Sequence, residues 1–378
     1  MRIAFVSDAA FPWHMGGIEA VERAEAEELA KIHEVHFFSM QWPGMEHEFT
    51  DKRIQYHTLG KTSSERFYRH GRRSIRAALK FAASTINIFR FRFSVIECNM
   101  FPILHIPVLR LYCKLFGCKL VLDVVEVWDR NYWKEYLKNP LFAWLGGAAA
   151  SLFVKMADAY IANSSVTAQK LEKIGILRSK ISVFAPILND NELKPFISKE
   201  GKRNTIVYWG RLIKEKRLDK WILAVKEAQR KVKGARGLII GDGPEEKEIR
   251  GIIKKERLQN IIKIRRPIVK REELWEQIGS CAVLLHMSER EGLGLVVLES
   301  IALGIPVVLP SYTPIPKEVR DMCLVESEES IPEKLAEILR SQRHSKYIKN
   351  RENLSEFEIS GINRFYERLF SRLRPNGR

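Results

Sequence analysis

A short stretch in the second half of the chain carries cations at a place where an anion could bind. The sequence G-R-L-I-K-E-K runs from Gly210 to Lys216 and follows an apolar run typical of a buried strand. Open α/β sheets bind ligands at the carboxyl ends of their strands, so Arg211 and Lys216 would project into such a site. A guanidinium and an ammonium group together suit a diphosphate. The alternative is a solvated basic loop, because Lys214 and Arg217 are close neighbours.

A second stretch, S-E-R-E-G-L-G-L-V-V-L-E-S, places carboxylates around a pair of glycines. Glu291 is expected in a loop after a strand, and Gly292, Leu293 and Gly294 then lead into a helix that carries Glu299. Carboxylates in these positions can accept hydrogen bonds from sugar hydroxyls. A spacing of eight does not place them on one helical face, so they would serve different parts of a ligand. Taken alone, Glu299 is best explained as a surface residue of a helix.

Two glycine-rich segments are weaker signals. In H-M-G-G-I-E, Gly16 and Gly17 would let a phosphate or sugar approach the backbone where the first helix begins. The segment lacks the G-x-G-x-x-G spacing of a dinucleotide site, and a simple turn explains it equally well. The segment Gly241-Asp242-Gly243-Pro244 fits a tight turn between a strand and a helix.

The elements that must position these residues alternate between strands and helices along the whole chain. Short β-branched runs predict strands, and amphipathic stretches between them predict helices, which together indicate parallel sheets covered on both faces. We predict an α/β protein of two doubly wound, Rossmann-like domains, together with a linker and a terminal helix that returns to the first domain. The predicted boundaries are 1–186, a linker at 187–203, 204–360 and a C-terminal helix at 361–378.

Composition sets limits on the function. The 378 residues are 46% hydrophobic, which excludes a disordered or disulfide-stapled protein, and carry a formal charge of +17, which favours an anionic partner. Five cysteines occur without a C-x-x-C pair or zinc-ligand spacing, so we expect reduced, mostly buried thiols and no metal site. The longest apolar stretch, 140–154, is shorter than the roughly 20 residues that a spanning helix needs. We expect a cytoplasmic protein without a signal peptide.

The order of these motifs resembles the retaining glycosyltransferases of family 4 (glycosyl transferases group 1). The motifs are G-G after the first strand, G-R-L-x-x-E-K, G-x-G-P, and E-G-L-G-L-V-x-L-E-S-x-A-x-G-x-P-V-V. The resemblance covers nearly the whole chain. It implies a GT-B architecture, in which the two Rossmann-like domains face each other across a cleft. It further implies transfer of a hexose from a nucleotide-diphosphate sugar, a co-substrate, with retained anomeric configuration and with neither a metal ion nor a cofactor.

The resemblance also implies roles for particular residues. Arg211 and Lys216 match the pair that holds the donor diphosphate, and both would act in catalysis with Glu291, the carboxylate near the donor sugar. Glu299 matches the residue that binds the ribose. The remaining matches to the donor site are Gly16 and Gly17 near the phosphates, Ile268 and Val269 beside the base, and Gly292, Leu293 and Gly294 in the loop.

Two positions depart from the family pattern. Family members commonly have a histidine near the reacting sugar, after the strand written here K-L-V-L-D-V-V-E-V-W, and Val125 takes its place. Glu126 is our candidate to supply the missing polar contact, and His14 is another. The chain also has S-Y-T-P-I-P-K-E-V where relatives have a glycine-rich stretch. A catalytically silent sugar-nucleotide-binding or scaffold protein is therefore a rival interpretation.

The segment Lys61–Phe93 points to the acceptor side. It holds nine Lys and Arg residues against Glu65 alone, with six aromatic residues among them. Such a segment suits a helix lying flat on an anionic membrane, as an enzyme that extends lipid-linked saccharides would need. A solvated helix is the plainer explanation. Nucleic acid is the competing partner and a nucleic-acid-binding protein a second rival, but no nucleic-acid motif accompanies the charge. We therefore expect a saccharide or lipid-linked acceptor, and a peripheral position at the inner face of the cell membrane.

Overall fold

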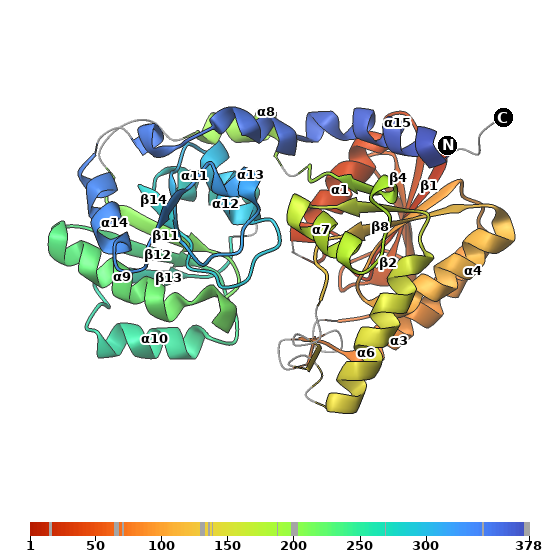
Figure 1. Ribbon diagram of the computed structural model, residues 1–378, viewed down its shortest axis with the longest axis horizontal. Coiled ribbons are helices and arrows are strands. Elements are labelled where there is room, and N and C mark those ends of the chain that lie inside the picture. Colours follow the sequence, from red (N-terminus) through yellow and green to blue (C-terminus); the bar gives the residue numbers. More distant parts are fainter. Residues whose placement is uncertain are drawn as a thin grey trace. The chain divides into compact units, whose positions relative to one another are not determined.

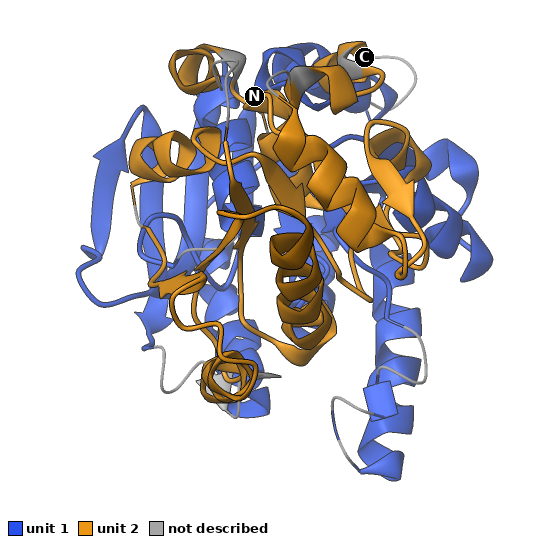
Figure 2. Ribbon diagram, turned by 90° about the vertical axis from the view of Figure 1, so that its left-hand side faces the viewer, with its two compact units in different colours: residues 1–187, 356–378 blue, residues 188–355 orange. Residues whose placement is uncertain are grey.

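The chain folds into two compact units, shown in different colours in Figure 2. Unit 1 comprises Met1–Ile187 with Glu356–Arg378, and unit 2 comprises Leu188–Ser355. The computed structural model describes residues 1–14, 17–63, 68–69, 72–128, 133–134, 137, 139–186, 188–197, 203–268, 270–341 and 344–373. Both units are built on sheets of mainly parallel strands covered by helices, which confirms the predicted α/β class.

Unit 1 contains an eight-stranded sheet in the order β10-β9-β8-β7-β1-β2-β4-β3. All neighbouring strands run parallel except β3, which pairs antiparallel with β4. The strands are β1 (Arg2–Val6), β2 (Glu34–Gln41), β3 (Glu48–Asp51), β4 (Ile54–Lys61), β7 (Val95–Asn99), β8 (Lys119–Val124), β9 (Ala159–Ala162) and β10 (Ile181–Val183). The chain order reverses between β1 and β7, so the loops after these two strands diverge at a topological switch point.

Helices cover both faces of this sheet (Figure 1). The helices are α1 (Gly17–Leu29), α3 (Ile75–Ser84), α4 (Ile106–Phe116), α6 (Pro140–Phe153), α7 (Ser165–Lys173) and α15 (Ile362–Leu373), with 3₁₀ turns η1 (Thr85–Arg90), η2 (Ile103–His105), η3 (Val154–Met156) and η4 (Arg178–Lys180). One core cluster joins α3, α4 and α6 to the sheet, and a second joins α1 and α15 to it. Neighbouring residues of β8 alternate between the two clusters, since Leu120 and Leu122 belong to the first and Val121 to the second. The clusters therefore lie on opposite faces of the sheet.

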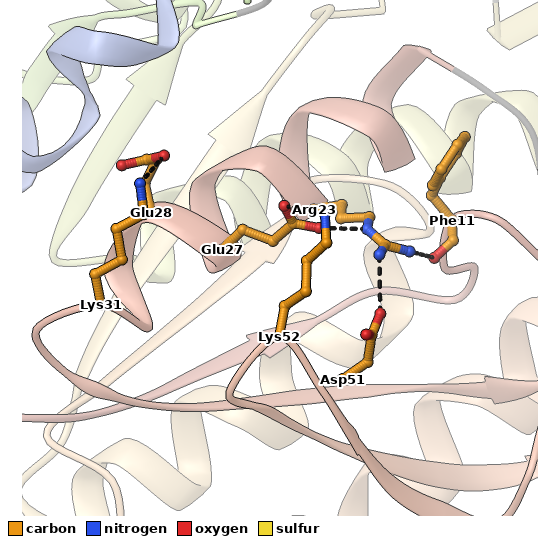
Figure 3. Close-up of polar contacts among 7 residues, drawn as sticks. All are labelled: Phe11, Arg23, Glu27, Glu28, Lys31, Asp51 and Lys52. Atoms are coloured by element: carbon orange, nitrogen blue, oxygen red, sulfur yellow. Dashed lines mark hydrogen bonds and ion pairs between the residues drawn. The ribbon is translucent and has the colours of Figure 1, made fainter. Parts of the chain in front are cut away.

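The β3–β4 hairpin is an element that our interpretation of the sequence did not predict. Ion pairs tie it to α1 (Figure 3): Arg23 Nη2 lies 2.8 Å from Asp51 Oδ2, and Lys52 Nζ lies 2.9 Å from Glu27 Oε2. Arg23 also donates to Glu27 at 2.6 Å and to the carbonyl oxygen of Phe11 at 3.4 Å. A single guanidinium thus links α1 to the hairpin and to the loop after β1.

The segment Lys61–Phe93, which we described as suited to a helix lying flat on a membrane, is helical in only part of its described residues. The residues described there form the short strands β5 (Tyr68–Arg69) and β6 (Arg72–Arg73), then α3 and η1. Phe81 and Phe93 are buried, and Phe89 and Phe91 pack against the core. These four aromatic rings therefore belong to the core of unit 1 and are not available to a membrane surface.

Unit 2 contains a six-stranded parallel sheet in the order β13-β12-β11-β14-β15-β16. The strands are β11 (Thr205–Trp209), β12 (Arg236–Ile240), β13 (Ile262–Arg265), β14 (Val283–Leu285), β15 (Val307–Pro310) and β16 (Leu324–Glu326). The helices are α8 (Asp190–Leu193), α9 (Leu218–Lys231), α10 (Glu246–Lys255), α11 (Arg271–Gly279), α12 (Leu295–Ala302), α13 (Lys317–Arg320) and α14 (Ile331–Arg340), with 3₁₀ turns η5 (Lys194–Phe196), η6 (Lys214–Lys216), η7 (His344–Tyr347), η8 (Arg351–Phe357) and, in unit 1, η9 (Ile359–Gly361). In chain order the strands read 3-2-1-4-5-6, which is the order of a Rossmann sheet, with its switch point between β11 and β14.

Three further features bear on the predictions from sequence. The C-terminal helix α15 is part of unit 1, where the hydroxyl of Tyr366 donates to Glu97 at 2.8 Å. All five cysteines lie among the described residues, and each is buried and free of disulfide bonds, as expected. Within the described ranges, we find no helix with the length and apolar character to cross a membrane.

Candidate functional site

The charged residues singled out from the sequence of unit 2 meet at the switch point of its sheet. The loop after β11 carries Arg211 and Lys216, and the loop after β14 carries Glu291. Because β11 and β14 pair in parallel, their carboxyl ends lie at the same edge of the sheet. At such an edge, diverging loops leave room for a ligand.

Lys216 and Glu291 form an ion pair across this edge, although 75 residues separate them in the sequence. His286, the residue after β14, lies with its Nε2 2.6 Å from the same carboxylate oxygen, Glu291 Oε1. His286 is 1% exposed, and its Nδ1 has no hydrogen-bond partner among the described residues. The sequence patterns did not single out His286. Its position one residue past an apolar run was the available signal.

The environment of Glu291 keeps its carboxylate charged. Burial raises the pKa of this carboxyl, but His286 and Lys216 act against burial more strongly and lower the pKa to about 2. Glu291 is therefore ionised throughout the neutral range. An ionised carboxylate between two donors holds the Lys216 ammonium in place and retains lone pairs for further donors.

Glu299 lies in a separate environment from Glu291. It is 9% exposed in α12, and Arg271, at the start of α11, donates to its Oε1. The Arg271 guanidinium also lies over the ring of Trp275, 5.0 Å from its centroid. Burial raises the pKa of Glu299 while Arg271 opposes that rise. Arg271 is a second residue that the sequence did not single out. As predicted, Glu291 and Glu299 do not share a helical face.

Arg211 follows the end of β11 and is exposed. The Tyr208 hydroxyl donates to the carbonyl oxygen of Arg211 at 2.8 Å. Burial raises the pKa of Tyr208, and of the two charged neighbours Glu291 raises it further while Arg211 lowers it. Arg211 and Glu291 therefore both act on this one hydroxyl group, which places them in the same electrostatic neighbourhood.

The loop Gly210–Lys216 is not simply a solvated basic loop. Lys216 is paired with Glu291, and Arg217 pairs with Asp219 at 2.9 Å and also with Glu289. Arg211 and Lys214, in contrast, are exposed. The carboxylates that neutralise Lys216 and Arg217 belong in part to the β14 loop, so ion pairs connect the two loops at the sheet edge.

Glycines in the turn after β12 allow that turn to cross the loop after β11. A Cβ added to Gly241 would lie 1.9 Å from the carbonyl oxygen of Gly210, and one added to Gly243 would lie 2.3 Å from that of Leu212. Both glycines have positive φ, at 156° and 153°. The Leu212 amide donates to the Asp242 carbonyl at 2.7 Å. The glycines thus act on the site indirectly, by holding the backbone of the loop that carries Arg211.

The remaining residues predicted for the donor site have simpler positions. Gly292, Leu293 and Gly294 lead into α12, and Gly294 has φ of 85°, where an added Cβ would lie 2.6 Å from Ile315 Cδ1. Leu293 is buried, and Ile268 is half-buried after β13. Val269 lies outside the described residues, so its predicted contact with the base stays a prediction.

The predicted residues of unit 1 lie at the ends of its own strands. Gly17 is the exposed first residue of α1, whereas Gly16 lies outside the described residues. Val125 and Glu126 follow β8 and are half-buried. His14, in the loop after β1, has its Nδ1 3.0 Å from Glu19 Oε1. Both His14 and Glu126 remain candidates for the contact that Val125 cannot make.

Unit 1 also buries four carboxyl groups close together. Glu22 and Glu25 come from α1, Glu97 from β7 and Asp123 from β8, and each is less than a tenth exposed. Burial raises the pKa of every one, and for three of them the next largest influence is another acid. The pKa rises to about 8 for Glu97 and to about 7 for Asp123. We call these four residues the acid cluster; part of it holds protons at neutral pH.

Comparison with known families gives matches along nearly the whole chain. Residues 189–356 match the family described as glycosyl transferases group 1, and residues 15–191 match glycosyltransferase family 4. An exopolysaccharide phosphotransferase of Streptomyces coelicolor is 27% identical over 239 residues. That match covers 60% of this chain, which spans only about a quarter of the length of that curated relative.

Solved structures share the fold at low sequence identity. HepE of Anabaena, in complex with UDP and glucose, superposes with a TM-score of 0.71 at 15% identity, over 98% of this chain and all of that one. Sucrose-phosphate synthase of Thermosynechococcus elongatus gives 0.72 at 16% identity, over 98% of each chain. These likenesses, with the two sheets described above, show an architecture of two Rossmann-like units.

Proposed function

This chain belongs to the family 4 glycosyltransferases of GT-B fold, and from that premise we propose that it moves a hexose from a nucleotide-diphosphate sugar to a saccharide or lipid-linked acceptor. We propose further that the anomeric configuration is retained and that no metal ion takes part. The observation that carries the proposal is the Lys216–Glu291–His286 cluster at the switch point of unit 2. UDP is among the ligands named for HepE, which supports a nucleotide diphosphate as the donor's leaving group.

The reaction depends mainly on electrostatic stabilisation of its transition state by the protein. When the bond between the sugar and the diphosphate breaks, negative charge builds on the diphosphate and positive charge on the sugar. Arg211 and Lys216 would stabilise the first, in the role that a metal ion fills in other enzymes. Glu291, ionised because its pKa is about 2, would accept hydrogen bonds from sugar hydroxyls and stabilise the second. Glu299, held apart by Arg271, would bind the ribose.

The acceptor hydroxyl must lose a proton as it attacks. In a transfer with retention, the acceptor meets the sugar on the face that the diphosphate leaves, so the departing phosphate oxygen can accept that proton. A side-chain base is then unnecessary, and Val125 in place of the family's histidine is compatible with turnover. Glu126 would make a polar contact near the reacting sugar. The exopolysaccharide named for the Streptomyces relative supports a saccharide acceptor.

The donor can be tested by a thermal-shift screen with UDP, GDP, ADP and their glucose and mannose conjugates, followed by calorimetry on the best ligand. We expect Arg211→Ala and Lys216→Ala each to weaken binding by about 1–3 kcal/mol, because each removes a charge-assisted hydrogen bond. Lys214→Ala is the matched control, since it removes an exposed cation from the same loop. Unchanged affinity in both site variants would refute the assignment of the diphosphate site.

Two further outcomes separate the rival functions. A donor that binds but is neither hydrolysed nor transferred to any acceptor would indicate a catalytically silent sugar-nucleotide-binding protein. Salt-sensitive binding of nucleic acid that nucleotide sugars do not compete away would indicate a nucleic-acid-binding protein.

A further inference from the structure

Exposed large apolar side chains are concentrated on three neighbouring helices of unit 1. Among the described residues, eighteen large apolar side chains are exposed, and ten of them lie on α3, η1, α4 or α6. Helices α3 and α4 contact each other, and α4 contacts η3, the turn that continues α6. Residues of these helices share one core cluster beneath them, so they cover the same face of the sheet (Figure 1). We call the outer surface of α3, η1, α4, α6 and η3 the outer helical face.

Helix α6 presents its large apolar residues outward and its small ones inward. Leu141, Leu145 and Leu152 are spaced by four and seven residues, which places them on one side of the helix, and all three are exposed. Between them and beside them, Phe142 is 57% and Trp144 is 63% exposed. A surface helix of a water-soluble protein normally has the opposite arrangement, because its apolar stripe faces the core.

The inner side of α6 is built for close approach. Its buried residues are Ala143 and Ala150, and a Cβ added to Gly146 would lie 2.8 Å from the ring of Trp133. Small residues therefore fit the helix against unit 1, so the outward position of its leucines and aromatic residues follows from the packing. The exposed apolar side of α6 belongs to the native fold of unit 1.

Helices α3 and α4 repeat this arrangement in weaker form. Ile75 and Leu79 are exposed one turn apart on α3, while Phe81 is buried. Leu111 and Leu115 are exposed one turn apart on α4. Exposed apolar side chains from three helices are therefore gathered on one side of unit 1, and such a concentration marks an interaction site.

The charges on the outer helical face are all positive. Its helices and 3₁₀ turns contain no Asp or Glu, and their cations are Arg76, Lys80, Arg90, Arg110, Lys114 and Lys155. Arg110 is paired with Asp158, which lies just beyond η3, at 2.9 Å. The other five cations are exposed. A partner of this face must therefore be both apolar and anionic.

We propose that the outer helical face docks on a membrane that contains anionic lipids, with the apolar side of α6 inserted between the headgroups. A bilayer surface offers acyl chains and anionic phosphates side by side, which matches the two properties of the face. A second copy of this chain matches less well, because a two-fold contact through the face would bring cations against cations. Helix α6 has 14 residues, too few to span a bilayer, so it lies in the interface.

This inference rests on the proposed function for its purpose, because a lipid-linked acceptor lies at such a surface. It also changes which residues we assign to the membrane. The aromatic residues Phe81, Phe89, Phe91 and Phe93 point into unit 1, and α6, outside the predicted segment, supplies the exposed rings.

The test is flotation of the full chain with vesicles of phosphatidylcholine, with or without phosphatidylglycerol. We expect binding to the anionic vesicles at low salt and its loss at high salt. Phe142→Ser with Trp144→Ser should lower the vesicle partition coefficient about tenfold or more. Leu177→Ser, which replaces a 65% exposed residue of unit 1 outside the face, should leave it unchanged. Replacing Arg76 and Lys114 by alanine should lower the vesicle partition coefficient about fivefold for each cation removed.

Several outcomes would overturn the inference. One is a wild-type protein that does not float with anionic vesicles at low salt, and another is a Phe142/Trp144 variant that floats as well as the Leu177 control. If light scattering shows that the wild type is a dimer and the Phe142/Trp144 variant is a monomer, a second copy of the chain covers the face. Nucleotide binding by calorimetry is measured on the same samples. A wild-type protein that binds nucleotide but not anionic vesicles refutes only the docking, whereas a wild-type protein that binds vesicles but not nucleotide refutes only the proposed function.

Discussion

The acid cluster makes a specific prediction about how stability depends on pH. Glu97 is 2% exposed and accepts the hydroxyl of Tyr366 from α15 at 2.8 Å. Burial, reinforced by Asp123, raises the pKa of Glu97 to about 8, whereas an unfolded chain gives a glutamate about 4.3. The folded protein therefore holds a proton that the unfolded chain releases. The contribution of this proton to the free energy of unfolding is fully present below the unfolded-state pKa. It is lost as pH rises through the folded-state pKa.

The size of the effect follows from proton linkage. One additional proton bound in the folded state lowers the free energy of unfolding by about 1.4 kcal/mol for each unit of rising pH. This slope applies over the pH window that begins above the unfolded-state pKa and ends at about 8, the folded-state pKa of Glu97. Glu97→Gln keeps a carbonyl oxygen for Tyr366 but cannot ionise. We expect it to remove about 1.4 kcal/mol per pH unit of this slope and to be more stable than the wild type at the upper end of the window.

The measurement is urea unfolding at several pH values across that window, read by pulsed hydrogen exchange in peptides from β7 and β8. These peptides report on unit 1 separately from unit 2. Glu367→Gln, an exposed carboxyl next to Tyr366 on α15, is the matched control and should keep the wild-type slope. If the wild-type unfolding free energy of unit 1 stays flat or rises with pH, or if Glu97→Gln keeps the full slope, the reasoning about buried carboxyls is wrong.

Two further predictions concern unit 2. Glu291→Gln should lower kcat more than donor affinity, whereas Glu299→Gln should mainly weaken donor binding; the opposite pattern in steady-state kinetics would mean that their roles are exchanged. Gly241→Ala should destabilise unit 2 by at least about 2 kcal/mol, because its Cβ would lie 1.9 Å from a backbone oxygen. Gly251→Ala, where an added Cβ meets nothing within 4 Å, should instead stabilise α10 by about 0.5–1 kcal/mol. Equal unfolding free energies for the two alanine variants would contradict the close approach of the two loops.

Much of the fold could be predicted from local sequence patterns. The predicted runs that became β1, β2, β7 to β10 and β11 to β15 are apolar or alternate apolar with polar residues, and such short patterns are the main local signal for a strand. The placement of Arg211, Lys216 and Glu291 in loops after strands followed from the same alternation. Strands β3 and β16 were missed because they are short, and β4 because apolar and polar residues are mixed along it; all three depend on pairing with a neighbouring strand.

The partners of the charged residues were decided by the tertiary structure. In the sequence, Glu22 and Glu25 are ordinary helix glutamates, and nothing local shows that they lie buried beside Glu97 and Asp123. The pairing of Lys216 with Glu291, and the approach of His286 to it, depend on the Rossmann strand order that places β11 next to β14.

The same distinction applies to the outer helical face. Its apolar and basic composition can be read from the sequence alone. A helical pattern shows which residues share a side, but the side that faces the sheet is chosen by what packs beneath it. For α6, the packing of Trp133 against Gly146 determines which side faces the sheet. Phe142 and Trp144 are left exposed as a result. Composition and periodicity are local properties, whereas burial and pairing arise from contacts between residues far apart in the chain.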